Sequence, residues 1–199
     1  MNLETLQKFC STDEMRENLA RPWTVDEFTY ATDGCMLIRV PRIEGVEGNT
    51  SAPNVKKFFS EHGHDDGSEW LLIPETKGNE LVPCDECGGS GKYDECQECE
   101  GSGKVEYEND YNTYGMTCKT CDGSGKAGKG KECELCDGSG KMEKVVKIEL
   151  NGVLFNAGYL KLISALPSCQ IQVTVSEMHP PAYFRFDGGV GLLMPMRGE

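Results

Sequence analysis

One eight-residue pattern, C-x-x-C-x-G-x-G, occurs four times between residues 84 and 141, and Lys follows each copy. The copies begin at Cys84, Cys96, Cys118 and Cys133, so eight of the 11 cysteines lie in C-x-x-C pairs. A tetrahedral Zn²⁺ takes four thiolates at about 2.3 Å, and one tight turn presents both sulfurs of such a pair to the same ion. The repeat therefore predicts two zinc sites, each made from two half-sites.

The glycines of the repeat have a physical role in this interpretation. After the second cysteine the chain must turn sharply with its backbone N–H groups directed at sulfur, and glycine reaches a positive φ without steric cost. Such N–H groups donate to the thiolates and spread their negative charge.

Eight cysteines are also compatible with a disulfide framework, which is typical of secreted chains with a signal peptide. The N-terminal sequence MNLETLQKFC has no basic segment followed by an apolar run, so we expect no export signal and a cytoplasmic location. In a reducing compartment this pattern favours metal ligation, with redox dithiol or iron–sulfur chemistry as the alternatives.

Residues 84–141 resemble the cysteine-rich zinc domain of DnaJ-type co-chaperones. In that family the first and fourth units share one zinc ion and the second and third share the other, on a long, bent β-hairpin. The intervals of 8, 18 and 11 residues between successive pairs suit the same nesting, with 105–117 as the distal tip. The resemblance implies two Zn²⁺ ions: zinc 1 on Cys84, Cys87, Cys133 and Cys136, and zinc 2 on Cys96, Cys99, Cys118 and Cys121.

The rest of a DnaJ-type co-chaperone is missing from this sequence. The His-Pro-Asp tripeptide of a J domain does not occur, and the nearest string is His179-Pro180-Pro181. The Gly/Phe-rich linker and the client-binding β-domains are also absent. We therefore do not expect the chain to activate an ATP-driven chaperone, although holdase activity without a J domain stays open.

Composition and charge exclude some partners. The 199 residues contain no apolar run near the roughly 20 residues of a membrane span, so we expect a soluble chain without membrane contact. The net charge is −13, and residues 84–141 hold 13 Asp or Glu against 7 Lys. Each zinc ion with four thiolates adds about −2 more. This segment should therefore repel phosphate backbones.

The remaining sequence predicts an α+β body, residues 1–82 and 142–199, split by an insertion at 83–141. Because the N-terminal half alone has too few strands for a sheet, both halves must pair into one sheet system. The expected elements are a helix over 2–9 capped by Asn2, a hairpin over 23–40 turning at Asp33-Gly34, a helix from Pro53 to Gly63, a strand over 70–74, a hairpin over 144–156 turning at Asn151-Gly152, a helix over 157–167, and strands over 169–177 and 182–196.

This body is similar to one domain of the bacterial DNA polymerase sliding clamp over about 130 residues. The strings that carry the resemblance are Ala31-Thr32-Asp33-Gly34, Tyr159-Leu160 with Ala165-Leu166, and Leu193-Met194-Pro195-Met196-Arg197. A clamp subunit has three such domains, so a DNA-encircling ring would need six copies of this chain. Ring closure would use exposed strands such as 183–187 or 191–194, and the expected helices carry Lys8, Lys56, Lys57 and Lys161.

Several residues outside the repeat have alternative interpretations. Tyr107, Tyr111, Tyr114 and Met116 fall in the hairpin tip, where no core exists to bury them, so they are candidate contacts for a protein partner. Disorder of the tip is the other interpretation. The cysteines outside the repeat are expected to be small buried hydrophobic residues: Cys10, Cys35 and Cys169.

No catalytic constellation is present in the sequence, and zinc saturated by four thiolates has no open position for water, so we expect a chain that is not an enzyme. The favoured function is a zinc-binding protein-interaction adaptor. Its clamp-like body would present an acidic zinc hairpin to a protein partner of unknown identity, in a replication-associated setting that the clamp resemblance implies. A holdase, a clamp-like ring on DNA and a thiol–disulfide exchange enzyme are the alternatives.

Overall fold

The structure is a computed structural model that describes residues 1–62, 67–176 and 180–196, without the side chains of 93–94 and 127–131. It divides into two compact units. The first, here called the body, is Met1–Asn79 with Val145–Glu199, and the second, here called the cysteine unit, is Glu80–Lys144. The cysteine unit extends beyond the expected 83–141 because β5 (Glu80–Pro83) pairs with β10 (Lys141–Lys144).

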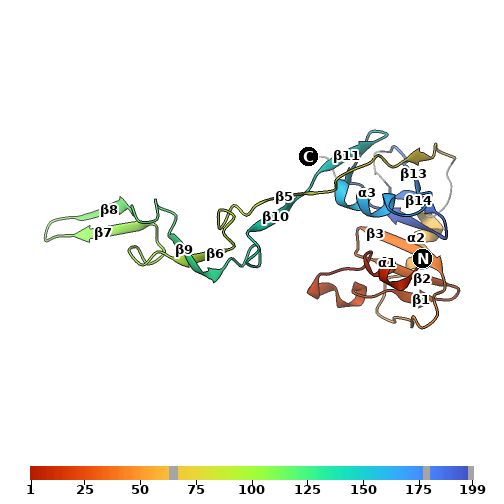
Figure 1. Ribbon diagram of the computed structural model, residues 1–199, viewed down its shortest axis with the longest axis horizontal. Coiled ribbons are helices and arrows are strands. Elements are labelled where there is room, and N and C mark those ends of the chain that lie inside the picture. Colours follow the sequence, from red (N-terminus) through yellow and green to blue (C-terminus); the bar gives the residue numbers. More distant parts are fainter. Residues whose placement is uncertain (63–66, 177–179, 197–199) are drawn as a thin grey trace. The chain divides into compact units, whose positions relative to one another are not determined.

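The body is built on a seven-stranded antiparallel sheet that takes strands from both halves of the sequence (Figure 1). The halves meet where β3 pairs with β15, with Ile38 opposite Gly191. This pairing confirms that one sheet system contains both halves. In sheet order the strands are β1 (Trp23–Val25), β2 (Phe28–Thr32), β3 (Met36–Pro41), β15 (Gly189–Leu193), β14 (Ala182–Phe186), β13 (Gln170–Gln172) and β4 (Leu71–Leu72).

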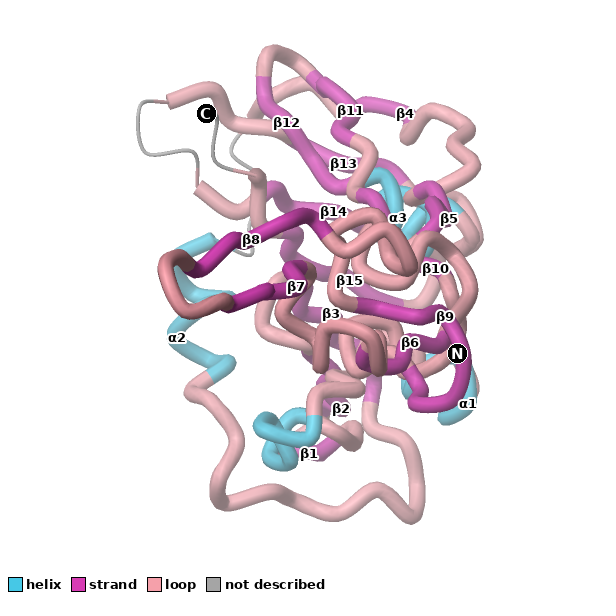
Figure 2. Tube along the Cα trace, turned by 90° about the vertical axis from the view of Figure 1, so that its left-hand side faces the viewer, coloured by secondary structure: helices cyan, strands magenta, loops and turns pink. Residues whose placement is uncertain are grey.

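Alternating side chains give the sheet two buried faces. On one face Ile38 and Phe184 pack with residues of α1 (Leu3–Gln7) and α3 (Ala157–Ser164). On the other face Tyr30, Leu37 and Leu192 pack with α2 (Val55–His62). Because successive strand residues point to opposite faces, the four central strands β2, β3, β14 and β15 contribute to both cores. The fold is α+β, mostly sheet with few short helices, as Figure 2 shows.

Local capping explains where the helices begin. The Asn2 side chain accepts a hydrogen bond from the Thr5 amide at 2.9 Å, and the Asn156 side chain accepts one from the Gly158 amide at 2.7 Å. Both satisfy amides that have no partner inside the first helical turn. The expected helices that begin after Asn2 and Asn156 are confirmed. The helix expected from Pro53 to Gly63 is confirmed as α2, although Gly63 itself lies outside the described residues. A 3₁₀ helix that the sequence did not predict spans Glu14–Leu19.

Two turn sequences position the hairpins of the body. Asp33 Oδ1 accepts from the amides of Cys35 and Met36 at 2.8 and 2.9 Å, which closes the turn between β2 and β3. Asn151 and Gly152, with φ of 50° and 80°, join β11 (Lys147–Leu150) to β12 (Val153–Asn156). Both predicted hairpins are confirmed. The stretch 23–40 contains a further turn at Asp26, φ 52°, so it forms three strands.

The structure corrects the expected edges of the sheet. β14 and β15 are interior strands, each paired on both sides, and the edges of this sheet are β1 and β4. Segments 183–187 and 191–194 are therefore not free to pair with a second subunit. The helix lysines do not share a face either, because α1 and α3 cover one side of the sheet and α2 covers the other.

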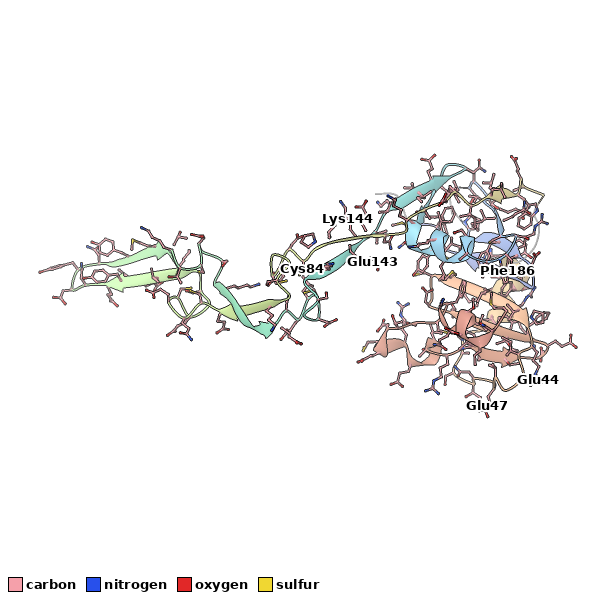
Figure 3. The ribbon with its side chains drawn as sticks, in the orientation of Figure 1. Glu44, Glu47, Cys84, Glu143, Lys144 and Phe186 are labelled. Carbon is pink, nitrogen blue, oxygen red and sulfur yellow. The ribbon has the colours of Figure 1, made fainter. Side chains whose placement is uncertain are left out.

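The cysteine unit consists of three nested two-stranded ladders. They pair β5 with β10, β6 (Lys92–Glu95) with β9 (Lys126–Glu132), and β7 (Lys104–Glu108) with β8 (Thr113–Thr117). Figure 3 labels Glu143 and Lys144 on β10, and Cys84 follows the end of β5. None of the described helices in either unit has the length and apolar character needed to cross a bilayer.

Candidate metal centre

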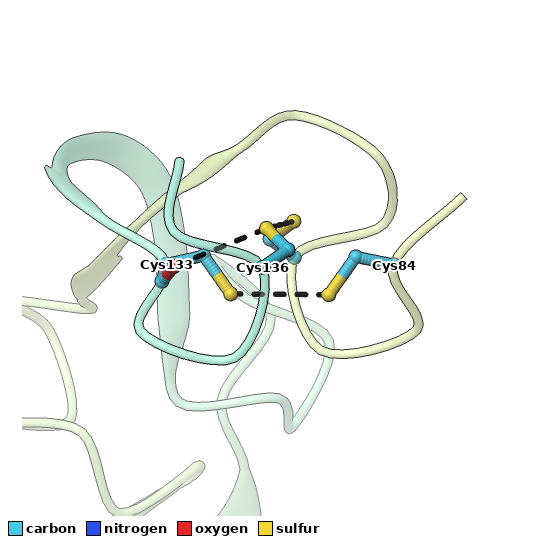
Figure 4. A group of neighbouring side chains, drawn as sticks. Cys84, Cys133 and Cys136 are labelled. Atoms are coloured by element: carbon cyan, nitrogen blue, oxygen red, sulfur yellow. Dashed lines mark hydrogen bonds between the residues drawn. The ribbon is translucent and has the colours of Figure 1, made fainter. Parts of the chain in front are cut away.

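Eight cysteines meet in two groups within the cysteine unit. Within each group the four sulfurs lie within 4.8 Å of one another. In group 1 the Sγ–Sγ distances are 3.9 Å for Cys84–Cys133 and 3.7 Å for Cys87–Cys136 (Figure 4). In group 2 they are 3.8 Å for Cys96–Cys118 and 3.7 Å for Cys99–Cys121. The groups are Cys84, Cys87, Cys133 and Cys136 (group 1) and Cys96, Cys99, Cys118 and Cys121 (group 2).

These distances fit one tetrahedral metal ion in each group. Four sulfurs at about 2.3 Å from a central Zn²⁺ are separated from one another by about 3.8 Å. A disulfide would instead bring two sulfurs to about 2.05 Å. All eight cysteines are free thiols in this structure, and seven of them are buried. The donor set and its spacing therefore suit zinc, and each group could hold one metal ion.

The glycine turns aim amides at the second sulfur of every C-x-x-C pair. The amide of Gly91 donates to Cys87 Sγ at 3.3 Å. The same hydrogen bond occurs in the other three units, from Gly103 to Cys99, Gly125 to Cys121 and Gly140 to Cys136, at 3.2–3.3 Å. This pattern agrees with the role that the sequence predicted for the glycines.

The same glycines let the half-sites approach each other closely. A Cβ on Gly91, whose φ is +73°, would lie 2.1 Å from the carbonyl oxygen of Gly138. A Cβ on Gly103 would lie 2.3 Å from the oxygen of Gly123. No side chain fits at these separations, so glycine is required both for the backbone conformation and for the contact between half-sites.

Backbone hydrogen bonds fix which half-sites pair. The Cys84 amide donates to Gly140 O and the Cys133 amide to Gly91 O, both at 2.9 Å, which joins the first unit to the fourth. The amides of Cys96 and Cys118 donate to Gly125 O and Gly103 O at 2.8 and 3.0 Å, which joins the second unit to the third. The arrangement is therefore nested.

The amides also change the acidity of the thiols. Desolvation raises the pKa of Cys87, but hydrogen bonds from the Gly91 and Gly89 amides outweigh it, and the pKa falls to about 6. At Cys121 desolvation is likewise outweighed, chiefly by the Gly125 amide, and the pKa falls to about 7. Desolvation raises the pKa of Cys96 to about 11. Each group thus contains a thiol whose pKa lies below its ordinary value.

Two of the comparisons with known proteins found no match. No family model matches the chain, and no curated protein matches it. The DnaJ-type resemblance therefore rests on the cysteine motif alone.

Solved structures similar to the chain are sliding clamps. One is the DNA polymerase III subunit beta of Bartonella birtlesii, at 18% identity and a TM-score of 0.38, and another is the beta clamp of C. crescentus, at 14% and 0.37. In both cases the similarity covers 98% of this chain and 63% of the clamp chain. Because the identity and the TM-score are this low, the similarity to the clamps supports no functional assignment.

The β7–β8 hairpin has two chemically different faces. Tyr107 pairs with Tyr114 and Val105 with Met116, so these four side chains share one face, and Glu106 and Glu108 belong to the other. The two tyrosines are 64% and 49% exposed. Beyond them Tyr111, 89% exposed, lies in a turn where Asn109 Oδ1 accepts from the amides of Tyr111 and Asn112. The four residues predicted as partner contacts are thus all exposed on the β7–β8 hairpin.

The body contains an apolar pocket of about 290 Å³ that sequence reasoning missed. It lies between the β2–β3 turn, the N-terminal part of α2 and the last strand. Phe58 and Met194 in its wall are each 47% exposed. The clamp-like strings at 31–34 and 193–197 could have indicated it, since both contribute to the wall. The pocket is lined by Asn18, Leu19, Thr32, Gly34, Cys35, Met36, Leu37, Ser51, Pro53, Val55, Phe58, Pro181, Leu192 and Met194.

The cysteines outside the repeat differ from one another. Cys10 is buried and Cys169 is partly buried, and both belong to or pack against the main core. Cys35 is exposed, so the expectation that all three are buried is wrong for this residue. Cys35 follows the Asp33-Gly34 turn, where the chain is at the surface and lines the pocket.

Proposed function

We propose that this chain is a zinc-binding protein-interaction adaptor without catalytic activity. The observation that carries the proposal is the sulfur spacing of 3.7–3.9 Å in both cysteine groups. Zn²⁺ held by four thiolates acts as a structural cross-link and has no open position for a reacting water. Zinc in this role supports a binding scaffold.

The cysteine unit depends on these cross-links. Its two hydrophobic clusters consist of the cysteines themselves, with only Val105 and Met142 packed beside them among the described residues. Because so little apolar surface is buried, metal binding would supply much of the folding free energy of the unit. The zinc ions would hold the β7–β8 hairpin in a defined conformation.

The exposed face of that hairpin is the proposed contact for a protein partner. Tyrosine and methionine are enriched in interface cores, and large exposed apolar patches mark interaction sites. Glu106 and Glu108 on the opposite face keep the ribbon soluble and disfavour contact with phosphate backbones. The partner is therefore proposed to be a protein, bound through Tyr107, Tyr111, Tyr114 and Met116.

The pocket of the body supplies a second surface for the adaptor. A well-formed apolar pocket with a few polar groups is the usual place for a ligand or an anchoring side chain. Its exposed wall residue Phe58 is suited to receive an apolar side chain of a partner. The pocket is therefore a second candidate contact for the protein partner.

Purification of complexes on the zinc-loaded chain tests this function. We expect one folded partner at a defined stoichiometry, lost on the double change Tyr107→Ser and Tyr114→Ser and retained on Leu135→Ser, an exposed apolar residue of the same unit. Suppression of aggregation of an unfolded model protein would instead support the holdase. Reduction of insulin would support thiol–disulfide exchange, and a mass near six chains in light scattering would support the ring.

A further inference from the structure

Arg39 in the body holds its guanidinium between two aromatic rings. Its Cζ atom lies 4.7 Å from the ring centre of Phe28 on β2 and 4.4 Å from that of Phe59 on α2. Both distances are within the range of a cation–π contact. The rings hold the guanidinium in place at the edge of the α2 side of the sheet.

The hydrogen-bond donors of this guanidinium are unused. In the residues that the structure describes, Arg39 has no carboxylate within ion-pair distance and its side chain makes no hydrogen bond. A guanidinium carries five N–H donors in its plane. Aromatic rings contact its faces and leave the donors at its edge available. A planar oxyanion can therefore bind this edge through two parallel hydrogen bonds.

A second stacked arginine in the body provides a comparison. Arg185 lies over the Trp70 ring with its Cζ 3.9 Å from the ring centre. Its Nε and Nη2 atoms donate to Gln170 Oε1 at 3.1 and 2.7 Å. Among the described residues, the stacked Arg185 therefore already has an acceptor, whereas the stacked Arg39 has none.

Arg39 faces an open hollow of about 510 Å³ that also contains Tyr30 and Lys56. The carboxylate of Asp26 forms an ion pair with Lys56, and Arg42 Nη1 donates to the Asp26 carbonyl oxygen at 3.0 Å. The side chains that line the hollow include two cations, Arg39 and Lys56, and two carboxylates, Asp26 and Glu27. Because Lys56 is paired with Asp26, Arg39 is the lining cation without an ion pair among the described residues, and its guanidinium can take one carboxylate.

We propose that this hollow binds a carboxylate of a protein partner next to an apolar side chain, with Arg39 as the bidentate donor. Phe28, 37% exposed, and Phe59 supply the apolar surface beside the guanidinium. Glu27 and the acidic chain disfavour a polyphosphate, whereas a single carboxylate needs one guanidinium edge. This site rests on the proposed adaptor function and adds a contact on the body that is separate from the apolar pocket, and a free peptide tests it separately from the hairpin contact.

The test is a titration of the full-length zinc-loaded chain, labelled with ¹⁵N, with the peptide N-acetyl-Glu-Phe-amide. The side-chain Nε–H signals of Arg39 and Arg185 are observed by NMR, and the spectra of Arg39→Lys and Arg185→Lys assign them. We expect a saturable shift of the Arg39 signal only. The matched N-acetyl-Gln-Phe-amide should leave it unmoved, and Arg39→Lys should bind the acidic peptide at least about tenfold more weakly, because lysine lacks the planar fork.

Three results would overturn the proposal. The first is no shift of the Arg39 signal, or an equal shift with the Gln peptide. The second is unchanged peptide affinity in Arg39→Lys, provided that its methyl and aromatic spectra show a native fold. The third is a response to AMP at lower concentration than to the acidic peptide, which would indicate a nucleotide site.

Discussion

Lys126 and Glu86 form an ion pair that links the two cysteine groups. Glu86 lies between the two cysteines of the first unit, which belongs to group 1, and Lys126 follows the third unit, which belongs to group 2. The Lys126 ammonium also donates to the Glu86 carbonyl oxygen at 3.4 Å. The two proposed zinc sites are thus connected by a charged contact across 40 positions of the sequence.

Replacing Glu86 by Gln should weaken this link only modestly. The two side chains are 30% and 49% exposed, so solvent screening limits the ion pair to about 1 kcal/mol at most. We expect chelator-driven metal loss to accelerate by no more than about fivefold, and the difference to disappear at 1 M salt. Glu98→Gln is the matched control, because Glu98 has the equivalent position in the second unit and no ion pair among the described residues. Equal acceleration in both variants would count against the link.

Metal analysis should find two zinc ions per chain in protein purified without added metal. Cys99→Ser should retain one ion, in group 1, because it removes a ligand from group 2 alone, and Cys136→Ser should retain one ion, in group 2, because it removes a ligand from group 1 alone. Cys35→Ser should retain two, because Cys35 belongs to neither group. Native mass spectrometry gives the count for each variant. Protein with almost no zinc and four disulfides would contradict the assignment.

Gly91→Ala should disrupt group 1 far more than Gly88→Ala. Both glycines have a positive φ, so either substitution costs about 1–2 kcal/mol from backbone conformation. Only at Gly91 would the new methyl overlap a carbonyl, at 2.1 Å from Gly138 O, whereas nothing lies within 4 Å at Gly88. The readout is the chelator concentration that removes half of the metal. Equal loss in the two variants would show that the approach of the half-sites is unimportant.

The three cysteines outside the groups should react at different rates in the zinc-loaded chain. Burial raises the pKa of Cys10 from 9.0 to about 11, against a smaller lowering by a hydrogen bond with the Thr32 backbone and with a small further rise from the charge of Asp33. Burial also raises the pKa of Cys169 to about 12. A rise of two pH units lowers the thiolate fraction about a hundredfold at pH 8. Iodoacetamide should therefore modify Cys35 first, by peptide mass spectrometry, and reaction of Cys10 at the same rate would refute this.

The sequence was most informative where structure is determined locally. The cysteine repeat predicted the nested grouping because each turn sets its own sulfurs and the intervals restrict which turns can meet. The hairpins at Asp33-Gly34 and Asn151-Gly152 and the helix capped by Asn2 were predicted for the same reason. In each case a few adjacent residues contain the whole signal.

Features that join distant segments were not predictable in this way. The Arg39 hollow combines β2, β3 and α2, and the apolar pocket also needs the last strand. The strands at 183–187 and 191–194 were expected to be edges, but β13 pairs with β14 and β3 pairs with β15, and the edges of this sheet are β1 and β4. Strand order depends on pairing across the whole chain, which a pattern of alternating residues does not encode. Cys35 was expected to be buried because it borders an apolar run, whereas its exposure depends on the turn.

Asn79, the last residue of the body before the cysteine unit, accepts hydrogen bonds from the amides of Val146 and Gly158 at 3.1 and 3.3 Å. The two ends of the insertion are therefore joined by hydrogen bonds at Asn79, and the β5–β10 ladder begins beside this residue. An insertion whose ends already meet costs the host little chain entropy, whatever its length. The cysteine unit is therefore an insertion that evolution can add, remove or replace without changing the register of any strand in the sheet of the body.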